Sequence, residues 1–255
     1  MTDTQTTELK KLSEDALDEA ESVWNKVGDK LMIMAKHAAF ANESIQNRAV
    51  DSQIPGYPVV EDGVPVVDEF VSMVADIRDS TGHLMQAISA KTTKVSQLQR
   101  VYYETSAFLP CVAQIVAWNQ GAVTEYLGDG LLALFRAKPS RDEAIYAAHR
   151  TAKAALEAVT SVVNPLLKER YNLPALDMGI GMALSKAVVT VVGLKDFKQP
   201  KAFGQCVFHA TKVASGWNKI IVDEAMYHAW PTTNDGTLKF EKVPCKGGVV
   251  GYELR

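Results

Sequence analysis

Residues 121–135 read GAVTEYLGDGLLALF, two apolar runs on either side of a tight polar turn. The runs at 122–126 and 131–136 predict two strands, and the Gly-Asp-Gly between them is typical of a hairpin turn. Asp129 therefore lies at the tip of a predicted hairpin. Aspartate is common in turns because its side chain bonds its own backbone, so Asp129 alone does not indicate a site.

The segment at 70–84, FVSMVADIRDSTGHL, carries a second carboxylate at the end of a strand. The predicted strand ends at Asp76, and Ser80 or Thr81 is a suitable N-cap for the helix that follows. A carboxylate beside free backbone N–H groups can hold a metal ion next to a phosphate, although many such aspartates only cap a helix. Together, Asp76 and Asp129 on adjacent strands indicate a site for one or two divalent cations that would clamp a phosphate.

The rest of the chain alternates between strand and helix patterns. The predicted order is β-α-β-β-α-β followed by further strands, which is typical of a ferredoxin-like α+β domain. The predicted strands lie at 69–76, 122–126, 131–136, 176–183, 187–193, 219–223, 238–243 and 249–254. The predicted helices lie at 81–118, with Pro110 as a kink or break, at 141–170 and at 206–217, with a loop at 194–203 and one more helix among the last strands.

Two elements precede this domain. Apolar residues step by three or four along 8–45, which predicts one long amphipathic helix that packs either on its own chain or on a second protomer. Residues 46–65 contain three prolines and two glycines without a helical period, which indicates a linker or an extended strap. We therefore divide the chain into an N-terminal helix at 1–48, a linker or strap at 49–65 and the main domain at 66–255.

Composition excludes several classes of protein. The chain has 255 residues, 47% hydrophobic and 22% charged, with a net charge of -3, which is typical of a folded globular domain. A slightly acidic chain without a basic run is a poor general nucleic-acid binder. No uncharged apolar run reaches the length of a membrane span, and the N-terminus lacks the apolar core of a signal peptide. Three scattered cysteines, with neither zinc spacing nor a CxxC pair, indicate reduced thiols in a cytoplasm.

Five segments, in the same order, resemble the motifs of the class III nucleotidyl cyclases, the family of the adenylyl and guanylyl cyclases. These segments are Val74–Thr81, Tyr126–Asp129, Asp177–Met182, Gly204–Val207 and Val243–Val249. The resemblance covers residues 68–255 and is specific because the segments occur together. It implies a ferredoxin-like class III cyclase catalytic domain at 66–255, with a βαββαβ core, extra C-terminal strands and, here, an N-terminal helical extension.

The resemblance also implies a mechanism. Asp76 and Asp129, helped by the carbonyl of Ile77, would ligate two Mn²⁺ or Mg²⁺ ions. The 3′-hydroxyl of a nucleoside triphosphate would attack its own α-phosphate and give a 3′,5′-cyclic nucleotide and pyrophosphate. Each site would form between two chains, so a homodimer with shared active sites is implied. The expected phosphate-binding residues are Arg78, Ser80 and Thr81, through their backbone, and Lys246.

The chain departs from the family's catalytic pattern after Val207. The family has an asparagine there and, four residues later, an arginine, which steady the ribose and the reacting phosphorus. Here these positions are Phe208 and Lys212. Lys212 keeps the positive charge of the expected catalytic residue but lacks the bidentate fork of arginine. Phenylalanine cannot hydrogen-bond a ribose, so His209 or Asn218 is the alternative partner.

The positions that read the base in this family correspond to Glu125 and Lys201, a combination that matches neither adenylyl nor guanylyl cyclases and that could also be a plain salt bridge. Tyr126 replaces a common threonine, and its bulk suits a smaller ring or stacks on a pyrimidine. The combination is similar to that of the Pycsar pyrimidine cyclases. This likeness implies synthesis of cyclic UMP from UTP as a messenger in anti-phage defence, read by a separate effector that need not bind the enzyme.

Two alternatives stay open. One is a cytidylate, guanylate or adenylate cyclase of the same fold, in which Glu125 would favour guanine over adenine if it faces the base. The other is a catalytically inactive cyclase-like module for dimerisation or ligand binding. Phe208 and Lys212 favour this second alternative, and the two aspartates and Lys246 oppose it.

Overall fold

The structure is a computed structural model, and it describes residues 1–31, 49–85, 95–194, 197–232 and 237–255. The chain divides into two compact units. The first, here called the helical unit, comprises Met1–Glu43, Asp79–Gln114 and Glu157–Leu176, and the second, the sheet unit, comprises Ser44–Arg78, Ile115–Leu156 and Asp177–Arg255.

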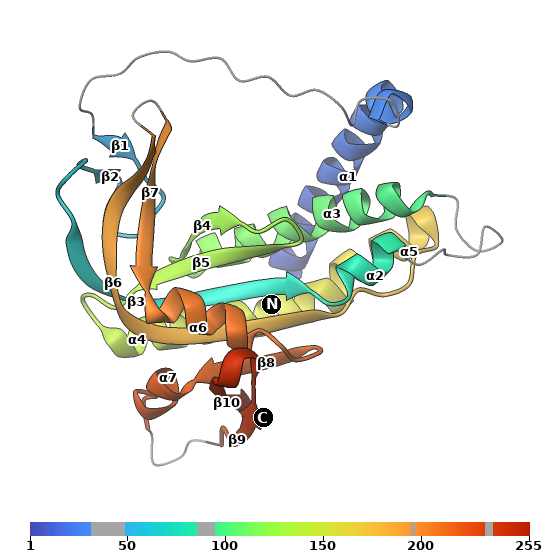
Figure 1. Cartoon of the computed structure of the whole chain (residues 1–255). Coiled ribbons are helices and arrows are strands. Elements are labelled where there is room, and N and C mark those ends of the chain that lie inside the picture. The colour runs from blue at the N-terminus through green and yellow to red at the C-terminus, as the bar shows by residue number, and fades with distance from the viewer. Residues whose placement is uncertain (32–48, 86–94, 195–196, 233–236) are drawn as a thin grey trace. The chain divides into compact units, whose positions relative to one another are not determined.

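The sheet unit is built on an eight-stranded sheet (Figure 1). Its strands follow the order β4-β5-β3-β6-β8-β10-β9, and β7 pairs with β6 beside this path. The first four strands of that order have the arrangement of a ferredoxin-like core, with the extra C-terminal strands added beyond β6. The strands are β3 (Val66–Ile77), β4 (Ala122–Tyr126), β5 (Gly130–Arg136), β6 (Met178–Leu194), β7 (Phe197–Gly204), β8 (Lys219–Asp223), β9 (Phe240–Pro244) and β10 (Val250–Leu254).

The central strand is β3, which pairs antiparallel with β5 on one side and β6 on the other. Its residues from Phe70 to Ala75 are all buried, which is why this strand reads as a nearly continuous apolar run. At its C-terminal end, Asp76 lies opposite Gly130 of β5 and Gly179 of β6. The polar residues that follow β3 are thus held at one end of the sheet.

Strands β6 and β7 differ from the prediction. The sequence predicted two strands at 176–183 and 187–193 and a loop at 194–203, whereas β6 is one unbroken strand and β7 occupies most of the expected loop. Ser185 and Lys186 read as a break, yet both lie within β6 and pair with β3. Pairing with β3 stabilises an extended backbone that the local sequence does not favour.

The sheet unit also contains most of α4 (Arg141–Ala158), with α6 (Gln205–Val213) and α7 (Glu224–His228). The helix predicted at 141–170 is present as α4, a π-helical turn (Val159–Val163) and α5 (Asn164–Tyr171). Helix α6 ends at Val213, earlier than predicted, because Ser215 and Gly216 follow and favour a turn.

The helical unit contains α1 (Asp3–Leu31), α2 (Ser80–Met85), most of α3 (Gln97–Trp118) and α5. The N-terminal helix is confirmed over Asp3–Leu31, while the rest of the predicted 8–45 helix lies outside the described residues. It packs on its own chain: the Trp24 ring lies 6.0 Å from that of Tyr102, and Arg170 pairs with Asp18 at 2.5 Å. Helix α3 continues through Pro110, so of the predicted kink or break the break does not occur.

The strap at 49–65 carries two short strands, β1 (Val50–Asp51) and β2 (Val59–Val60), which pair with each other. Ile54 and Val60 of this segment are buried in the same core cluster as Phe70. The strap therefore packs on the sheet unit. No helix within the described ranges has the length and apolar character that crossing a membrane requires.

Candidate active site

The two predicted metal-binding aspartates lie side by side at one end of the sheet. The backbone N–H of Ile77 donates to the carbonyl of Asp129 at 3.2 Å, and Asp76 lies opposite Gly130. A Cβ atom at Gly130 would lie 2.9 Å from the Asp76 carboxylate oxygen and 2.6 Å from the Ala75 carbonyl oxygen. Only glycine fits there, and the Asp76 carboxylate therefore lies directly against the residue that follows Asp129.

This donor set fits a hard divalent cation. Two carboxylates and the nearby carbonyl of Ile77 are oxygen ligands of the kind that Mg²⁺ and Mn²⁺ prefer. Across the described residues, no third Asp, Glu, His or Cys joins the pair. The remaining ligands would have to be water or substrate oxygens, as is usual for Mg²⁺ in phosphate-transfer sites.

The side chain of Arg78 lies in the same place. It is buried, with 9% of its surface exposed, and its guanidinium bonds the Asp76 carboxylate. Burial lowers the pKa of the guanidinium, and the negative charge of Asp129 opposes that change. A Cβ atom at Gly179 would lie 3.1 Å from this guanidinium, so the glycine leaves room for it. Arg78 thus contributes a fixed positive charge to the two-carboxylate cluster.

The sequence predicts only a backbone role for Arg78. Its N–H donates to the carbonyl of Asp177 at 2.8 Å, so this amide is used within the sheet unit. The sequence feature that could have predicted the place of the Arg78 side chain is its position two residues after Asp76. Residues i and i+2 of an extended chain share one face. Ser80 and Thr81 begin α2, as predicted, in the helical unit.

The two predicted base-reading residues form an ion pair. The ammonium of Lys201 on β7 lies 2.9 Å from the carboxylate of Glu125 on β4, and both side chains are partly buried. Tyr126, next to Glu125, has 60% of its surface exposed. One chain thus presents a donor, an acceptor and an aromatic ring on neighbouring segments.

Lys212 lies beside the turn that contains Lys246. The Lys212 side chain passes 3.7 Å from the position that a Cβ atom would take at Gly247, directly after Lys246. Phe208, one turn before Lys212 on α6, is 62% exposed. The predicted catalytic Lys212 therefore lies beside the turn that contains Lys246, the predicted phosphate-binding lysine, and α6 also presents an exposed aromatic ring.

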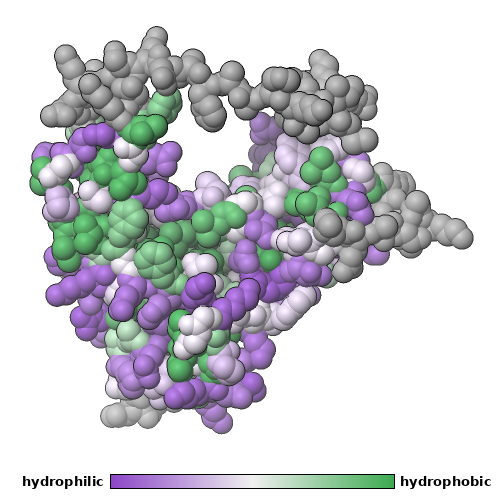
Figure 2. All heavy atoms as spheres, viewed as in Figure 1, coloured by the Kyte–Doolittle hydropathy of each residue, from purple (hydrophilic) through white to green (hydrophobic). Residues whose placement is uncertain are grey.

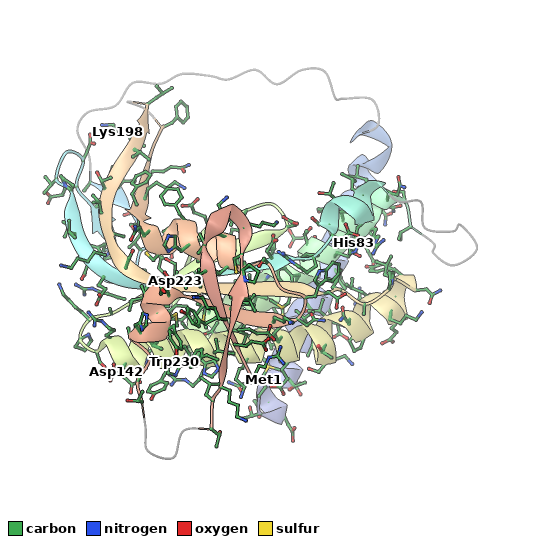
Figure 3. The ribbon with its side chains drawn as sticks, turned by 60° about the horizontal axis from the view of Figure 1, so that its bottom comes forward. Met1, His83, Asp142, Lys198, Asp223 and Trp230 are labelled. Carbon is green, nitrogen blue, oxygen red and sulfur yellow. The ribbon has the colours of Figure 1, made fainter. Side chains whose placement is uncertain are left out.

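The two alternative ribose partners have structural roles. The His209 ring lies 3.0 Å from Asp223, which is labelled in Figure 3. The buried Asp223 carboxylate also accepts the N–H groups of Leu184 and Met226. Asn218 accepts the N–H of Met178 at 3.1 Å and donates to the Asp177 carboxylate at 2.5 Å. His209 thus joins α6 to the end of β8, and Asn218, just before β8, holds the start of β6.

The fold is that of the class III cyclase catalytic domains. The guanylyl cyclase Cya2 superposes with a TM-score of 0.60 and 20% identity over 74% of this chain and 92% of that one. The adenylyl cyclase CyaB from P. aeruginosa superposes with a TM-score of 0.59 and 15% identity over 75% of this chain and 96% of that one. A class III adenylyl cyclase-like ATP-binding protein from Pseudomonas aeruginosa superposes with a TM-score of 0.59 and 19% identity over 83% of this chain and 43% of that one.

Comparison with protein-family models and with curated protein sequences finds no match. At these identities the likeness establishes the fold alone. The predicted α+β, ferredoxin-like cyclase fold with an N-terminal helix is thereby confirmed.

Proposed function

We propose that this chain is a nucleotidyl cyclase that converts a nucleoside triphosphate, UTP in particular, to its 3′,5′-cyclic monophosphate and pyrophosphate. The observation that carries the proposal is the adjacency of Asp76 and Asp129 across β3 and β5 in a cyclase fold. In this reaction the substrate's 3′-oxygen forms a bond to the α-phosphorus, and the bond from that phosphorus to the β-phosphate bridging oxygen breaks. The hydroxyl proton is released.

Asp76, Asp129 and the Ile77 carbonyl would hold two Mn²⁺ or Mg²⁺ ions. When bound, such ions acidify an attacking hydroxyl and neutralise phosphate charge. The chain's own residues position the substrate and add charge. Lys212 and Lys246 would neutralise the phosphates, with Ser80 and Thr81 as the proposed backbone contacts. The Arg78 N–H already has a partner, so we assign its phosphate contact to the side chain.

The preference for uracil follows from the chemistry of the Glu125–Lys201 pair. A lysine only donates hydrogen bonds and an ionised glutamate only accepts them. Uracil and guanine both present a carbonyl oxygen beside a ring N–H, which this pair matches. Cytosine and adenine present the same two functions in the reverse order, an amino group beside an acceptor nitrogen, so the pair favours the keto bases if Glu125 faces the ring nitrogen and Lys201 the exocyclic group. Tyr126 then favours the smaller of the two keto bases, since an added ring narrows the pocket.

A homodimer with shared sites is the second part of the proposal. Beyond its pairing with β3, β6 continues with β7 as a two-stranded arm (Figure 1) that exposes Val192, Leu194 and Phe197. Figure 2 shows hydrophobic residues gathered over this region. Exposed apolar side chains in a contiguous group are typical of an interaction surface, and a second copy of the chain is the partner that we propose.

An inactive cyclase-like module is the competing candidate. Phe208 is exposed on α6 where a ribose-binding group is expected, and the Asp76 carboxylate is already paired with Arg78. One of the solved structures above is itself described as an adenylyl cyclase-like ATP-binding protein. This candidate predicts nucleotide binding without turnover.

The cellular role is proposed from the sequence resemblance alone. A pyrimidine cyclase of this kind would act in the cytoplasm and make a messenger in anti-phage defence for a separate effector. That effector need not bind the enzyme.

One assay tests the enzymatic proposal. The purified chain is incubated with ATP, GTP, CTP or UTP and Mn²⁺, and products are identified by mass spectrometry. Cyclic UMP supports the proposal, and a cyclic purine alone would remove its pyrimidine part. Asp76→Asn and Asp129→Asn should each abolish turnover; full activity in either variant would refute the two-metal assignment. No product from any triphosphate would favour the inactive module.

A further inference from the structure

A cavity of about 780 Å³ lies in the sheet unit, and none of its lining residues is predicted to bind the triphosphate. Helix α4 contributes three of its lining residues, and the others come from α7 and the segment after it, from β9 and its approach, and from the C-terminal residue. Its volume falls within the range of small-molecule sites. Since α4, α7 and β9 belong to one compact unit, the cavity is formed within that unit.

One wall of the cavity is aromatic. Trp230, labelled in Figure 3, packs against Phe240 with their ring centres 5.2 Å apart and against His149 at 5.3 Å, both close to edge-on. Tyr227 lies 5.1 Å from Phe240. Each ring is fixed by its neighbours, so the wall is ordered before any ligand arrives. A planar ring is the ligand shape that such a wall binds best.

The charged side chains that line the cavity are cationic. Lys153 and Arg255 contribute two cations, and none of the described lining residues is an aspartate or a glutamate. Arg255 is already neutralised by Glu241 at 2.5 Å and Glu253 at 3.4 Å. Lys153 has no carboxylate within ion-pair distance in the described part of the chain. Of the two cations, Lys153 is therefore the one whose charge can pair with an anionic ligand.

The lysine and the aromatic wall are placed to bind one molecule together. His149 and Lys153 are four residues apart on α4 and so share a face of the helix, and the His149 ring lies against Trp230. A ring lying on Trp230 would have Lys153 within reach of a substituent. Burial lowers the pKa of His149 to about 4, with the charges of Lys153 and Arg150 acting in the same direction, so the histidine is neutral at pH 7.

We propose that this cavity binds a small planar ring compound that carries one carboxylate or phosphate group. The ring lies on Trp230 and Phe240, and the anionic group pairs with Lys153. The proposal concerns a site separate from the aspartate pair and does not depend on the cyclase activity.

The test uses two probes with the same ring and opposite charge. Naphthalene-2-carboxylate and naphthalen-2-ylmethylammonium are titrated into the full chain by calorimetry, in EDTA so that no divalent metal supports binding at the triphosphate site. The carboxylate should bind about tenfold more tightly, because Lys153 attracts one probe and repels the other. Equal affinities, or tighter binding of the ammonium, would overturn the proposal.

Variants locate the binding. Lys153→Met should weaken the carboxylate about threefold to fivefold and leave the ammonium unchanged, while Lys168→Met, an exposed lysine of α5 outside the cavity, should change neither. Trp230→Ala should remove binding of both probes, and Trp230→Phe should retain it, with circular dichroism as the check on folding. If Lys153→Met binds the carboxylate as the wild type does, the site is not the one proposed.

Discussion

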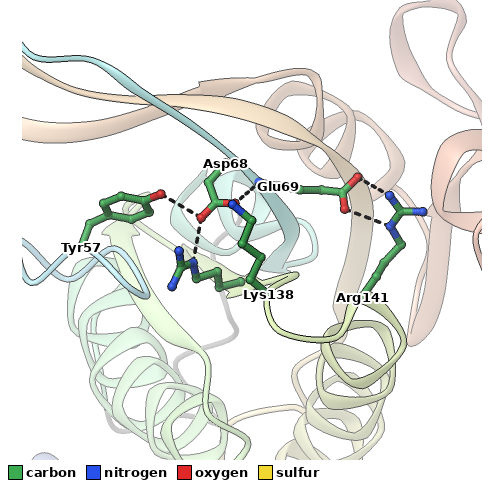
Figure 4. A network of polar contacts seen from close by, with 6 residues as sticks. Tyr57, Asp68, Glu69, Lys138 and Arg141 are labelled. Atoms are coloured by element: carbon green, nitrogen blue, oxygen red, sulfur yellow. Dashed lines mark hydrogen bonds and ion pairs between the residues drawn. The ribbon is translucent and has the colours of Figure 1, made fainter.

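The hydroxyl of Tyr57 donates a hydrogen bond of 2.8 Å to the carboxylate of Asp68, and this bond fastens the strap to the central strand (Figure 4). Asp68 is 3% exposed and also pairs with Arg136 at 2.7 Å and Lys138 at 3.1 Å. Burial alone would raise the pKa of Asp68, but its hydrogen bonds outweigh burial and hold the pKa well below its ordinary value. The strap is therefore tied to a charge that stays ionised in the folded protein.

We expect Tyr57→Phe to lower the free energy of unfolding by about 1–2 kcal/mol, since it removes one hydrogen bond to a buried charge and leaves the other partners in place. Asp68→Asn should cost more, about 3 kcal/mol, because Arg136 and Lys138 lose their counter-charge. Urea denaturation measures both changes.

The matched control for this pair is Glu69→Gln. It breaks the adjacent and more exposed pair with Arg141, visible in the same figure, and should cost less than about 1 kcal/mol. A loss for Tyr57→Phe no larger than that of the control would mean that the strap is held by apolar packing and not by this bond.

Gly130→Ala should disable the aspartate pair without removing either carboxylate. The new methyl group would lie 2.9 Å from the Asp76 carboxylate and 2.6 Å from a β3 carbonyl, so the carboxylate must move. We expect the cyclase rate to fall at least about 100-fold, since a displacement of about 1 Å at a reacting centre costs that much. Mn²⁺ binding, followed by electron paramagnetic resonance, should weaken in parallel.

Gly128→Asn is the control for Gly130. It changes the same turn, where no atom lies within 4 Å of the added Cβ, and asparagine tolerates the positive φ of 85°. This variant should keep its Mn²⁺ affinity. Equal Mn²⁺ affinity in Gly130→Ala and the wild type would show that Asp76 does not need its present position.

The Glu125–Lys201 pair offers a test of base choice in which the ion pair itself is preserved. In the double variant Glu125→Lys/Lys201→Glu the donor and the acceptor exchange places, so the pair should now match an amino group beside an acceptor nitrogen. We expect the ratio of UTP to CTP turnover to fall by at least about tenfold, the usual effect of mismatched hydrogen bonds at a recognition site. An unchanged ratio would mean that the pair is only a structural salt bridge.

How much of the structure could be predicted from the sequence depends on how far apart in the chain the contacting residues lie. The β4–β5 hairpin and the place of Asp76 followed from local patterns, because turn residues and alternating apolar residues lie within a few positions of each other. The long β6–β7 arm did not, since Ser185 and Lys186 are polar and only pairing with β3 keeps them extended. The Lys201–Glu125 bond joins residues far apart in the chain, so spacing could suggest it as an alternative but not decide it.

No pattern in the sequence predicts the cavity beside α4. Its aromatic wall and its lysine come from segments separated by about 80 residues, with no periodicity that links them. Phe208 and Lys212 are a different case. Their departure from the family pattern was visible in the sequence, and their placement on α6 now adds the proximity of Lys212 to the Lys246 turn.

Mixing two inactive variants tests the shared site. If Asp129 and Lys212 of one site come from different chains, a mixed dimer of Asp129→Asn and Lys212→Ala has one intact site. Activity should return to about a quarter of the wild-type rate, because half of the dimers are mixed and each has one working site of two. Continued inactivity, with mixed dimers confirmed by native mass spectrometry, would place both residues in one chain's site.

His149 should make the stability of the protein depend on pH between its folded and unfolded pKa values. Burial, followed by the charges of Lys153 and Arg150, lowers its pKa from 6.5 to about 4. Below pH 6.5 His149 is protonated in the unfolded chain, whereas in the folded chain it stays neutral down to about pH 4. The free energy of unfolding therefore falls as the pH is lowered from 6.5 to about 4. Above pH 6.5 the contribution is fully present.

His149→Gln should flatten the dependence of stability on pH between 6.5 and about 4. Lys153→Met should raise the pKa of His149, read from its ring protons by nuclear magnetic resonance. Identical pH dependence in the wild type and His149→Gln would show that the ring is protonated as easily in the folded chain as in water.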